Sequence, residues 1–253
     1  MCGIAGVYGS EAVVKACALM LGQLERGVKG AGVAYWLNGR LSVVKAPLHP
    51  VKFIFDNPSL LRVTSRVAIA HNRQPAGSGV SFENTHPFLA CSGRFALIHN
   101  GVSWNYYHER ERMARVHTIR GQTDSELIMH KLEEYARNGG LVHGFERLYN
   151  DNVMGAFLVL TVGGALYAAR DNMYPLHMYV DGVSVMFASS AKAFECVGAE
   201  AKGVEALKDF EVVVVREGRV KRYTLSVTRS YGYDVNYGYN YNRFYGLGYY
   251  YFP

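Results

Sequence analysis

The sequence has no apolar run long enough to cross a membrane. Runs such as residues 212–215 are far shorter than the roughly 20 residues that a spanning helix needs. The first residues also lack a basic stretch leading into an apolar one, so no signal peptide is predicted. These absences exclude the obvious membrane and secreted classes, and we expect a cytoplasmic protein that does not bind membranes.

Cysteine is scarce, with four residues in 253 that lie far apart: Cys2, Cys17, Cys91 and Cys196. No C-x-x-C pair suggests a zinc site, and no dense framework suggests disulfides. We therefore expect reduced cysteines, no metal and no cofactor.

Strong charge of one sign and phosphate-binding loops are also missing. The net charge is only +6, and basic residues in segments such as "HERERMARVHTIR" alternate with acids, as on a solvated helix face. No nucleic-acid-binding motif accompanies the charge, and no GxxxxGK[ST] motif is present. We expect no nucleic-acid partner.

What is present is a half-apolar chain with many strand and turn signals, enough for one large domain over residues 1–228. Two β-rich runs around Asn38-Gly39 predict a hairpin, because Asn-Gly favours a type I′ turn. Similar patterns predict three more hairpins, over residues 154–170, 176–189 and 210–225. Many strands joined by tight turns favour antiparallel sheets, with helices packed outside.

The predicted helices lie in separate stretches. Ser10 is placed to cap a helix that Gly27 would end. Residues 104–116 predict another, and residues 190–198 a short one. Thr123 and Glu126 form a capping box for a helix that reaches Gly139.

Residues 229–253 form a distinct extension rich in Tyr, Gly and Asn. Tyrosines recur at odd positions from Tyr231 to Tyr241, so an extended chain would show one aromatic face. One interpretation is a disordered low-complexity tail. The other is an ordered segment that adds a strand to a partner or to a second copy of the chain.

Cys2 becomes the first residue once Met1 is removed. A terminal cysteine carries a thiol and an α-amine whose pKa lies near neutrality, so one residue can supply both nucleophile and base. Cys2 alone is also consistent with a small buried residue at the start of a strand.

Other segments supply what an amide-cleaving site needs. "HNG" at 99–101 ends a predicted strand, where Asn100 and the Gly101 N–H can donate to an oxyanion. Arg73 ends another strand and suits a carboxylate. Asp124 lies in the first turn of a helix. There it either binds an ammonium group or only stabilises the helix through its favourable interaction with the helix dipole. Together they fit an α-amino acid amide.

Six segments in this order resemble class II glutamine amidotransferases: "CGIAG", "RGVKGAG", "HNRQPAG", "NTHPF", "HNGVSWNY" and "GQTDSELI". The resemblance covers roughly residues 2–225 and is closest to the glutaminase domain of amidophosphoribosyltransferase. It implies an α+β fold of the N-terminal-nucleophile hydrolases, a four-layer αββα sandwich of two antiparallel sheets. It also implies hydrolysis of L-glutamine through a γ-glutamyl thioester.

Carried over by position, the resemblance makes Cys2 the nucleophile with its α-amine as base, and makes Asn100 and Gly101 the oxyanion donors. Arg73 would bind the substrate carboxylate and Asp124 its ammonium group. The resemblance further implies that Arg26 orders the surroundings of the nucleophile and that His86 lies near the glutamine pocket.

The chain departs from the family pattern at Lys29, Gln74, Ala76 and Ser190. No synthase-like segment follows the glutaminase-like part, so the first hypothesis is a stand-alone glutaminase that passes ammonia to a separate synthase subunit. The second is a weakly active or inactive assembly protein that self-associates through its tail into a homo-oligomer. The third is an amidase for a different γ-glutamyl or amide substrate.

Overall fold

The computed structural model describes residues 1–75, 77–103 and 106–228, with only the backbone of residues 106–108. The predicted tyrosine-rich extension and the departure at Ala76 lie outside the described residues.

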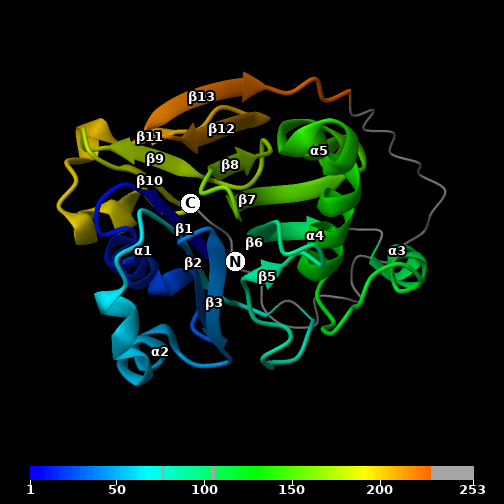
Figure 1. Ribbon diagram of the computed structural model, residues 1–253, viewed down its shortest axis with the longest axis horizontal. Coiled ribbons are helices and arrows are strands. Elements are labelled where there is room, and N and C mark those ends of the chain that lie inside the picture. Colours follow the sequence, from blue (N-terminus) through cyan, green and yellow to red (C-terminus); the bar gives the residue numbers. More distant parts are fainter. Residues whose placement is uncertain (76, 104–105, 229–253) are drawn as a thin grey trace, which may run out of the picture.

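Two antiparallel sheets form the centre of the molecule (Figure 1). The first has the order β11-β9-β10-β1-β4-β2-β3, and the second β13-β12-β8-β7-β6-β5. The strands of the first sheet are β1 (Gly3–Tyr8), β2 (Ala31–Leu37), β3 (Arg40–Ala46), β4 (Val67–Asn72), β9 (His177–Val180), β10 (Val185–Ala188) and β11 (Glu205–Ala206). Those of the second are β5 (Phe88–Leu89), β6 (Phe95–Ser103), β7 (Val153–Thr161), β8 (Leu166–Arg170), β12 (Glu211–Arg216) and β13 (Arg219–Thr224).

Helices cover the outer face of each sheet. On the first lie α1 (Ala12–Leu21), α2 (Pro50–Asp56) and the 3₁₀ segment η4 (Ala191–Val197); on the second lie α4 (Asp124–Tyr135) and α5 (Gly140–Asn150). α3 (Tyr106–Met113) packs beside α4, and short 3₁₀ turns are η1 (Leu24–Arg26), η2 (Pro58–Arg62), η3 (Ala136–Asn138) and η5 (Ala201–Gly203). Within the described ranges, no helix is both long and apolar enough to cross a bilayer.

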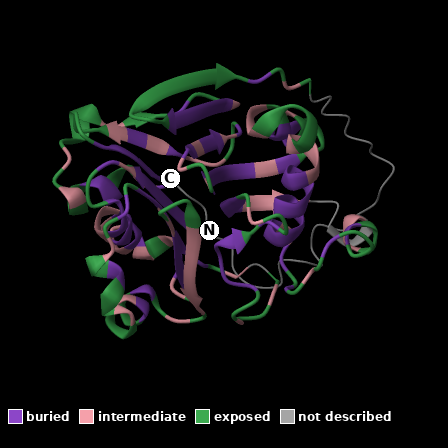
Figure 2. Ribbon diagram, viewed as in Figure 1, coloured by how far each residue is buried: buried purple, intermediate pink, exposed green. Residues whose placement is uncertain are grey.

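Three apolar cores follow from this layering. The middle core lies between the sheets and includes Ile4, Ile98 and Phe187, while the outer cores join each sheet to its helices. Figure 2 shows the buried residues along the central strands and the inward faces of the helices. The layers therefore read helix, sheet, sheet, helix, which confirms the predicted αββα sandwich.

The four predicted hairpins are present. β2 and β3 are joined through Asn38 and Gly39, whose φ angles of 51° and 76° fit the predicted type I′ turn. β7–β8, β9–β10 and β12–β13 form the other three.

The first helix differs from its prediction at both ends. α1 begins at Ala12 after Glu11, and Ser10 does not cap it. It ends at Leu21 instead of continuing to Gly27, because the side-chain amide of Asn72 donates to the carbonyls of Met20 (2.8 Å) and Gln23 (3.1 Å). The first bond satisfies a carbonyl in the last turn of α1 and the second a carbonyl just beyond it, so an early stop costs little.

The segment 99–101 is also different from its prediction. It does not end a strand, because β6 continues to Ser103 and stays paired with β7. Gly101 lies opposite Gly155, and the absence of two side chains lets the strands remain in register there.

Candidate active site

Cys2 lies at the amino end of β1, a strand held on both sides by β4 and β10. The residue is half-buried, whereas Met1 is 59% exposed. Arg26 Nε donates to the Cys2 carbonyl at 2.9 Å, and the Gln74 N–H donates to Cys2 Sγ at 3.3 Å. The backbone around the thiol is therefore fixed, while Met1 projects away from the packed core.

Asn100 faces Cys2 from β6 of the other sheet. The Cys2 N–H donates to Asn100 Oδ1 at 3.1 Å, and Asn100 is only 2% exposed. Its other amide atom, Nδ2, is buried and has no hydrogen-bond partner among the described residues. An unused buried donor is costly unless something binds it, so this N–H is available to a developing negative charge on a bound substrate.

Gly101 follows Asn100 where the backbones are too close for a side chain. A Cβ on Gly101 would lie 2.0 Å from the Met154 carbonyl oxygen and 2.4 Å from His99 Nε2. His99 joins three elements here, since Nδ1 lies 2.9 Å from Ser125 Oγ and Nε2 lies 3.1 Å from the Met154 carbonyl. Sequence reasoning missed His99, which holds the Asn100 strand to α4 and β7.

Arg73 leaves the end of β4 on the same side as Cys2. Its N–H donates to the Gly30 carbonyl at 2.8 Å, and its carbonyl accepts from the Lys29 N–H at 2.9 Å. In the guanidinium group, Nη2 donates to Ser78 Oγ at 2.8 Å, while Nη1 is buried without a partner in the described part of the chain. The unpaired N–H suits a carboxylate ligand.

Asp124 begins α4 as the sequence predicts. Its Oδ2 accepts from the Ser103 N–H at 2.9 Å and its Oδ1 from the Ser125 N–H at 2.8 Å. Thr123 Oγ1 caps the helix by accepting from the Glu126 N–H at 3.3 Å. The predicted capping box is only half formed, because Glu126 accepts from the backbone at residues 120 and 121 instead.

The thiol of Cys2 is held in its neutral form. Burial is the main cause, and it raises the pKa of the thiol. The Gln74 N–H, the terminal ammonium group and Arg73 lower this pKa, whereas Asp124 raises it further. Arg73 and Asp124 therefore act on the thiol with opposite signs. A neutral thiol needs a base before it can attack a carbonyl.

His86 occupies an enclosed position and is 3% exposed. Its ring lies 4.0 Å from that of His71 and 4.6 Å from Phe88 between ring centres, and neither ring nitrogen has a hydrogen-bond partner among the described residues. Burial lowers the pKa of His86 and lowers that of His71 to about 3. Both rings are therefore neutral packing groups near Arg73.

A hollow of about 280 Å³ opens next to the start of α4. The Gln122 N–H donates to Asn84 Oδ1 at 2.7 Å across it, two residues before Asp124. Cys2 does not line this hollow, whose lining residues are Gly79, Ser81, Glu83, Asn84, Arg120, Gly121 and Gln122.

Comparison with known proteins places this geometry in a family. A profile described as a glutamine amidotransferase domain matches residues 71–196. Glutamine–fructose-6-phosphate aminotransferase of Sulfolobus acidocaldarius is 28% identical over 229 residues, 87% of this chain and 38% of that protein. The enzyme of the same name from Streptomyces coelicolor is 32% identical over 228 residues, 86% of this chain and 36% of its own. The chain thus spans well under half the length of these relatives.

Solved structures share the fold. The structure of glutamine phosphoribosylpyrophosphate amidotransferase from B. subtilis aligns with a TM-score of 0.74 and 24% identity. The alignment covers 88% of the present chain and 49% of the B. subtilis chain. A glutamine aminotransferase class-II domain protein from Silicibacter pomeroyi matches 88% of this chain and 99% of its own, with a TM-score of 0.59 and 16% identity. The chain described here therefore carries a class II glutamine amidotransferase domain with the N-terminal-nucleophile fold.

Proposed function

We propose that this domain hydrolyses L-glutamine to glutamate and ammonia through a thioester on Cys2. The observation that carries the proposal is the pairing of Cys2 N with Asn100 Oδ1, which leaves Asn100 Nδ2 buried and without a partner among the described residues. One asparagine thereby holds the prospective base and offers a donor to the oxyanion.

The proposed reaction begins when Met1 has been removed and the Cys2 nitrogen is a free amine. The amine takes the thiol proton, directly or through water, as the sulfur attacks the γ-carbon of glutamine. Asn100 Nδ2 and the Gly101 N–H stabilise the oxyanion. The C–N bond then breaks, and the amine returns the proton to the leaving ammonia. Water attacks the thioester in the second half, which releases glutamate and restores the thiol.

Substrate orientation is assigned to the two charges that act on the thiol. Arg73 Nη1 would bind the α-carboxylate, and the Asp124 carboxylate would bind the α-ammonium group. Arg26 would keep the Cys2 carbonyl in place through its 2.9 Å bond. His86 would support the pocket as a buried, neutral ring and would make no charged contact with the substrate.

The ammonia acceptor is proposed to be a separate enzyme, with the tyrosine-rich extension as the segment that docks on it or on a second copy. The solved Silicibacter pomeroyi chain, matched over 99% of its length, likewise consists of this domain. Purifying the full chain from its native cell and identifying an accompanying synthase tests the acceptor. An unchanged oligomeric state after removal of residues 229–253 would contradict self-association through the extension.

At two of the departures from the family pattern, Lys29 and Gln74, the side chain makes no hydrogen bond to Cys2 among the described residues. Lys29 and Gln74 have exposed side chains, and Gln74 contacts Cys2 only through its backbone. These positions therefore give little support to an inactive assembly protein.

Glutamate and ammonia release by the wild type and by Cys2→Ala tests the proposal. Intact mass must first show that Met1 is absent from the wild type. We expect turnover in the wild type and none above background in Cys2→Ala. Equal rates in the two would exclude Cys2, and retention of Met1 with no turnover would favour the assembly protein.

A further inference from the structure

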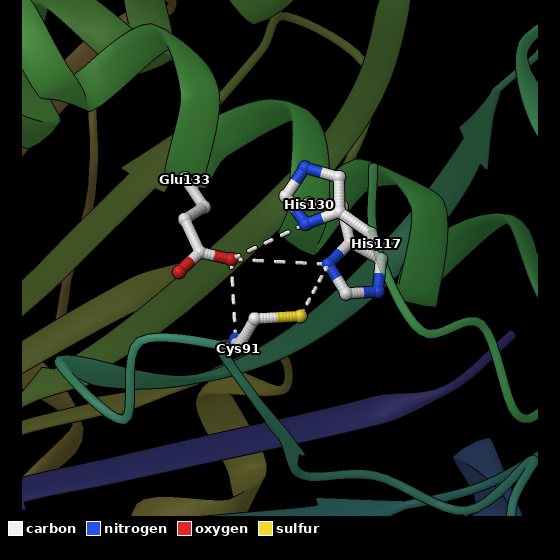
Figure 3. A group of neighbouring side chains, drawn as sticks. All are labelled: Cys91, His117, His130 and Glu133. Atoms are coloured by element: carbon white, nitrogen blue, oxygen red, sulfur yellow. Dashed lines mark hydrogen bonds and ion pairs between the residues drawn. The ribbon is translucent and has the colours of Figure 1, made fainter. Parts of the chain in front are cut away.

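A second group of reactive side chains lies where α4 meets the turn after β5, the edge strand of the second sheet. It consists of Cys91 in the turn between β5 and β6, His117 in the loop between α3 and α4, and His130 and Glu133 on α4. One atom from each, sulfur, nitrogen, nitrogen and oxygen, lies within 4.8 Å of all the others. Figure 3 shows the four side chains directed toward one another from these three segments.

The separations suit a tetrahedral metal ion. Cys91 Sγ is 3.6 Å from His130 Nδ1, and Glu133 Oε2 is 3.8 Å from both His130 Nδ1 and His117 Nδ1. Ligands bound tetrahedrally to zinc at 2.0–2.3 Å lie about 3.3–3.7 Å apart. Three of the six separations are therefore within a few tenths of an ångström of this range, and the other three are at most 4.8 Å.

His117 is already held in the form that a metal needs. Its Nε2 lies 3.3 Å from Glu134 Oε1, and Arg112 holds that carboxylate at 3.3 Å. With Nε2–H donating to Glu134, Nδ1 keeps a lone pair that points into the cluster. This nitrogen is buried and has no hydrogen-bond partner in the part of the chain that the structure describes. A carboxylate behind a metal-bound histidine is the usual supporting contact.

Glu133 is fixed in the same way. Its Oε2 accepts from the Cys91 N–H at 3.1 Å and its Oε1 from the Ser92 N–H at 2.8 Å. The side chains of His117 and His130 are 3% and 2% exposed, whereas Cys91 is exposed and leaves a route for an ion to enter. A thiolate, a carboxylate and two neutral imidazoles carry a charge of about −2, which a divalent cation would balance.

A purely hydrogen-bonded cluster explains these contacts less well. The ion-pair separations of 3.8 Å between Glu133 and the two histidines exceed a hydrogen bond. The stacked histidine rings, 4.4 Å apart, also disfavour a charge on both. Neither contact gives His117 Nδ1 a partner, whereas a metal would.

We propose that Cys91, His117, His130 and Glu133 form a structural zinc site. Mixed sulfur, nitrogen and oxygen ligands suit zinc, and four protein ligands leave no open position for catalysis. The ion would tie the β5–β6 turn and the α3–α4 loop to α4. Asp124 is the first residue of α4 and lies six residues before His130. The site would therefore stabilise the helix that positions Asp124. The sequence predicted no metal because it lacks paired cysteines, whereas this proposed site has one cysteine and takes its ligands from three segments.

The test measures zinc in the full chain after zinc loading and gel filtration. We expect about one zinc per chain in the wild type and in the matched control Cys196→Ser, whose thiol is exposed elsewhere. Cys91→Ser and His130→Gln should lose the metal, with circular dichroism confirming the fold. Glu134→Gln should bind zinc roughly tenfold more weakly. No bound zinc in the wild type, or equal zinc in Cys91→Ser, would overturn the proposal.

Cobalt provides a readout that does not depend on a variant folding. Cobalt bound to the wild-type chain should show thiolate charge-transfer absorption and should protect Cys91, but not Cys196, from alkylation. The same absorption in Cys2→Ala would exclude the active-site thiol as its source. Equal alkylation of Cys91 with and without metal would overturn the proposal.

Discussion

The substitution Asn100→Asp separates the two roles of Asn100. Aspartate keeps an oxygen where Asn100 Oδ1 accepts from the Cys2 nitrogen at 3.1 Å. It replaces the buried, unpartnered Nδ2 donor with a second acceptor of nearly the same shape. Positioning of the Cys2 nitrogen is therefore preserved, while the donor to the oxyanion is lost.

Loss of one oxyanion donor lowers kcat by about 10²–10³, or about 2.7–4 kcal/mol of transition-state stabilisation. A carboxylate beside the developing oxyanion also repels it, so we expect a loss at the upper end of that range or beyond. KM should change little, because the proposal assigns binding of the substrate's α-groups to Arg73 and Asp124. The parallel variant Asn100→Ala removes both roles and should be no more active.

Steady-state glutaminase kinetics give kcat and KM for each variant. The rate of Cys2 alkylation by iodoacetamide is the control for an intact nucleophile and should resemble the wild type in Asn100→Asp. A kcat near that of the wild type in Asn100→Asp, with normal alkylation, would refute the role of Nδ2.

The remaining predictions concern stability and substrate binding. Gly101→Ala should lower the free energy of unfolding by about 1–3 kcal/mol or more in urea titrations, because the added Cβ would clash with backbone atoms. Gly79→Ala is the control, since a Cβ there has nothing within 4 Å, and its stability should not change. Equal stabilities of the two variants would contradict the packing argument. His71 has its pKa lowered to about 3 by burial, with Arg73 and His99 adding to this, so the folded state keeps the ring neutral while the unfolded chain protonates it below about pH 6.5. Its contribution to stability is therefore present above that pH and falls by about 2 kcal/mol between pH 7 and pH 5; a flat urea midpoint over this range would be inconsistent with the neutral ring. Arg73→Lys should raise KM for glutamine more than it lowers kcat, because lysine lacks the forked donors, and an unchanged KM would remove Arg73 from carboxylate binding.

The sequence predicted the layers and hairpins because their signals are local. Turn dipeptides such as Asn38-Gly39 and the apolar alternation of the strands need no knowledge of distant contacts. The ends of elements were harder, since α1 stops where Asn72 reaches its carbonyls from 52 residues away. α5 carries glycines at 140 and 144 and was not predicted, but Phe145, Leu148 and Tyr149 bury its inner face against the second sheet.

The candidate site was predicted in part for the same reason. Cys2 stands at the chain terminus, Arg73 at the end of a strand and Asp124 at the start of a helix, so their places were visible in the sequence; Asn100 was placed at a strand end, whereas it lies within β6. His99 was not visible as a supporting residue, because its value lies in contacts with α4 and β7. The four side chains of the proposed zinc site were not visible either, since only folding brings their three segments together.

The central claim is that the thiol and amine of one terminal residue open a carboxamide together. Acid quenching during turnover, followed by peptide mass spectrometry, tests it most directly. We expect a γ-glutamyl group on the sulfur of a Cys2 that has lost Met1, removable by hydroxylamine and absent in Cys2→Ala. Turnover of glutamine with an unmodified Cys2 peptide, or with the acyl group on another residue, would contradict the account.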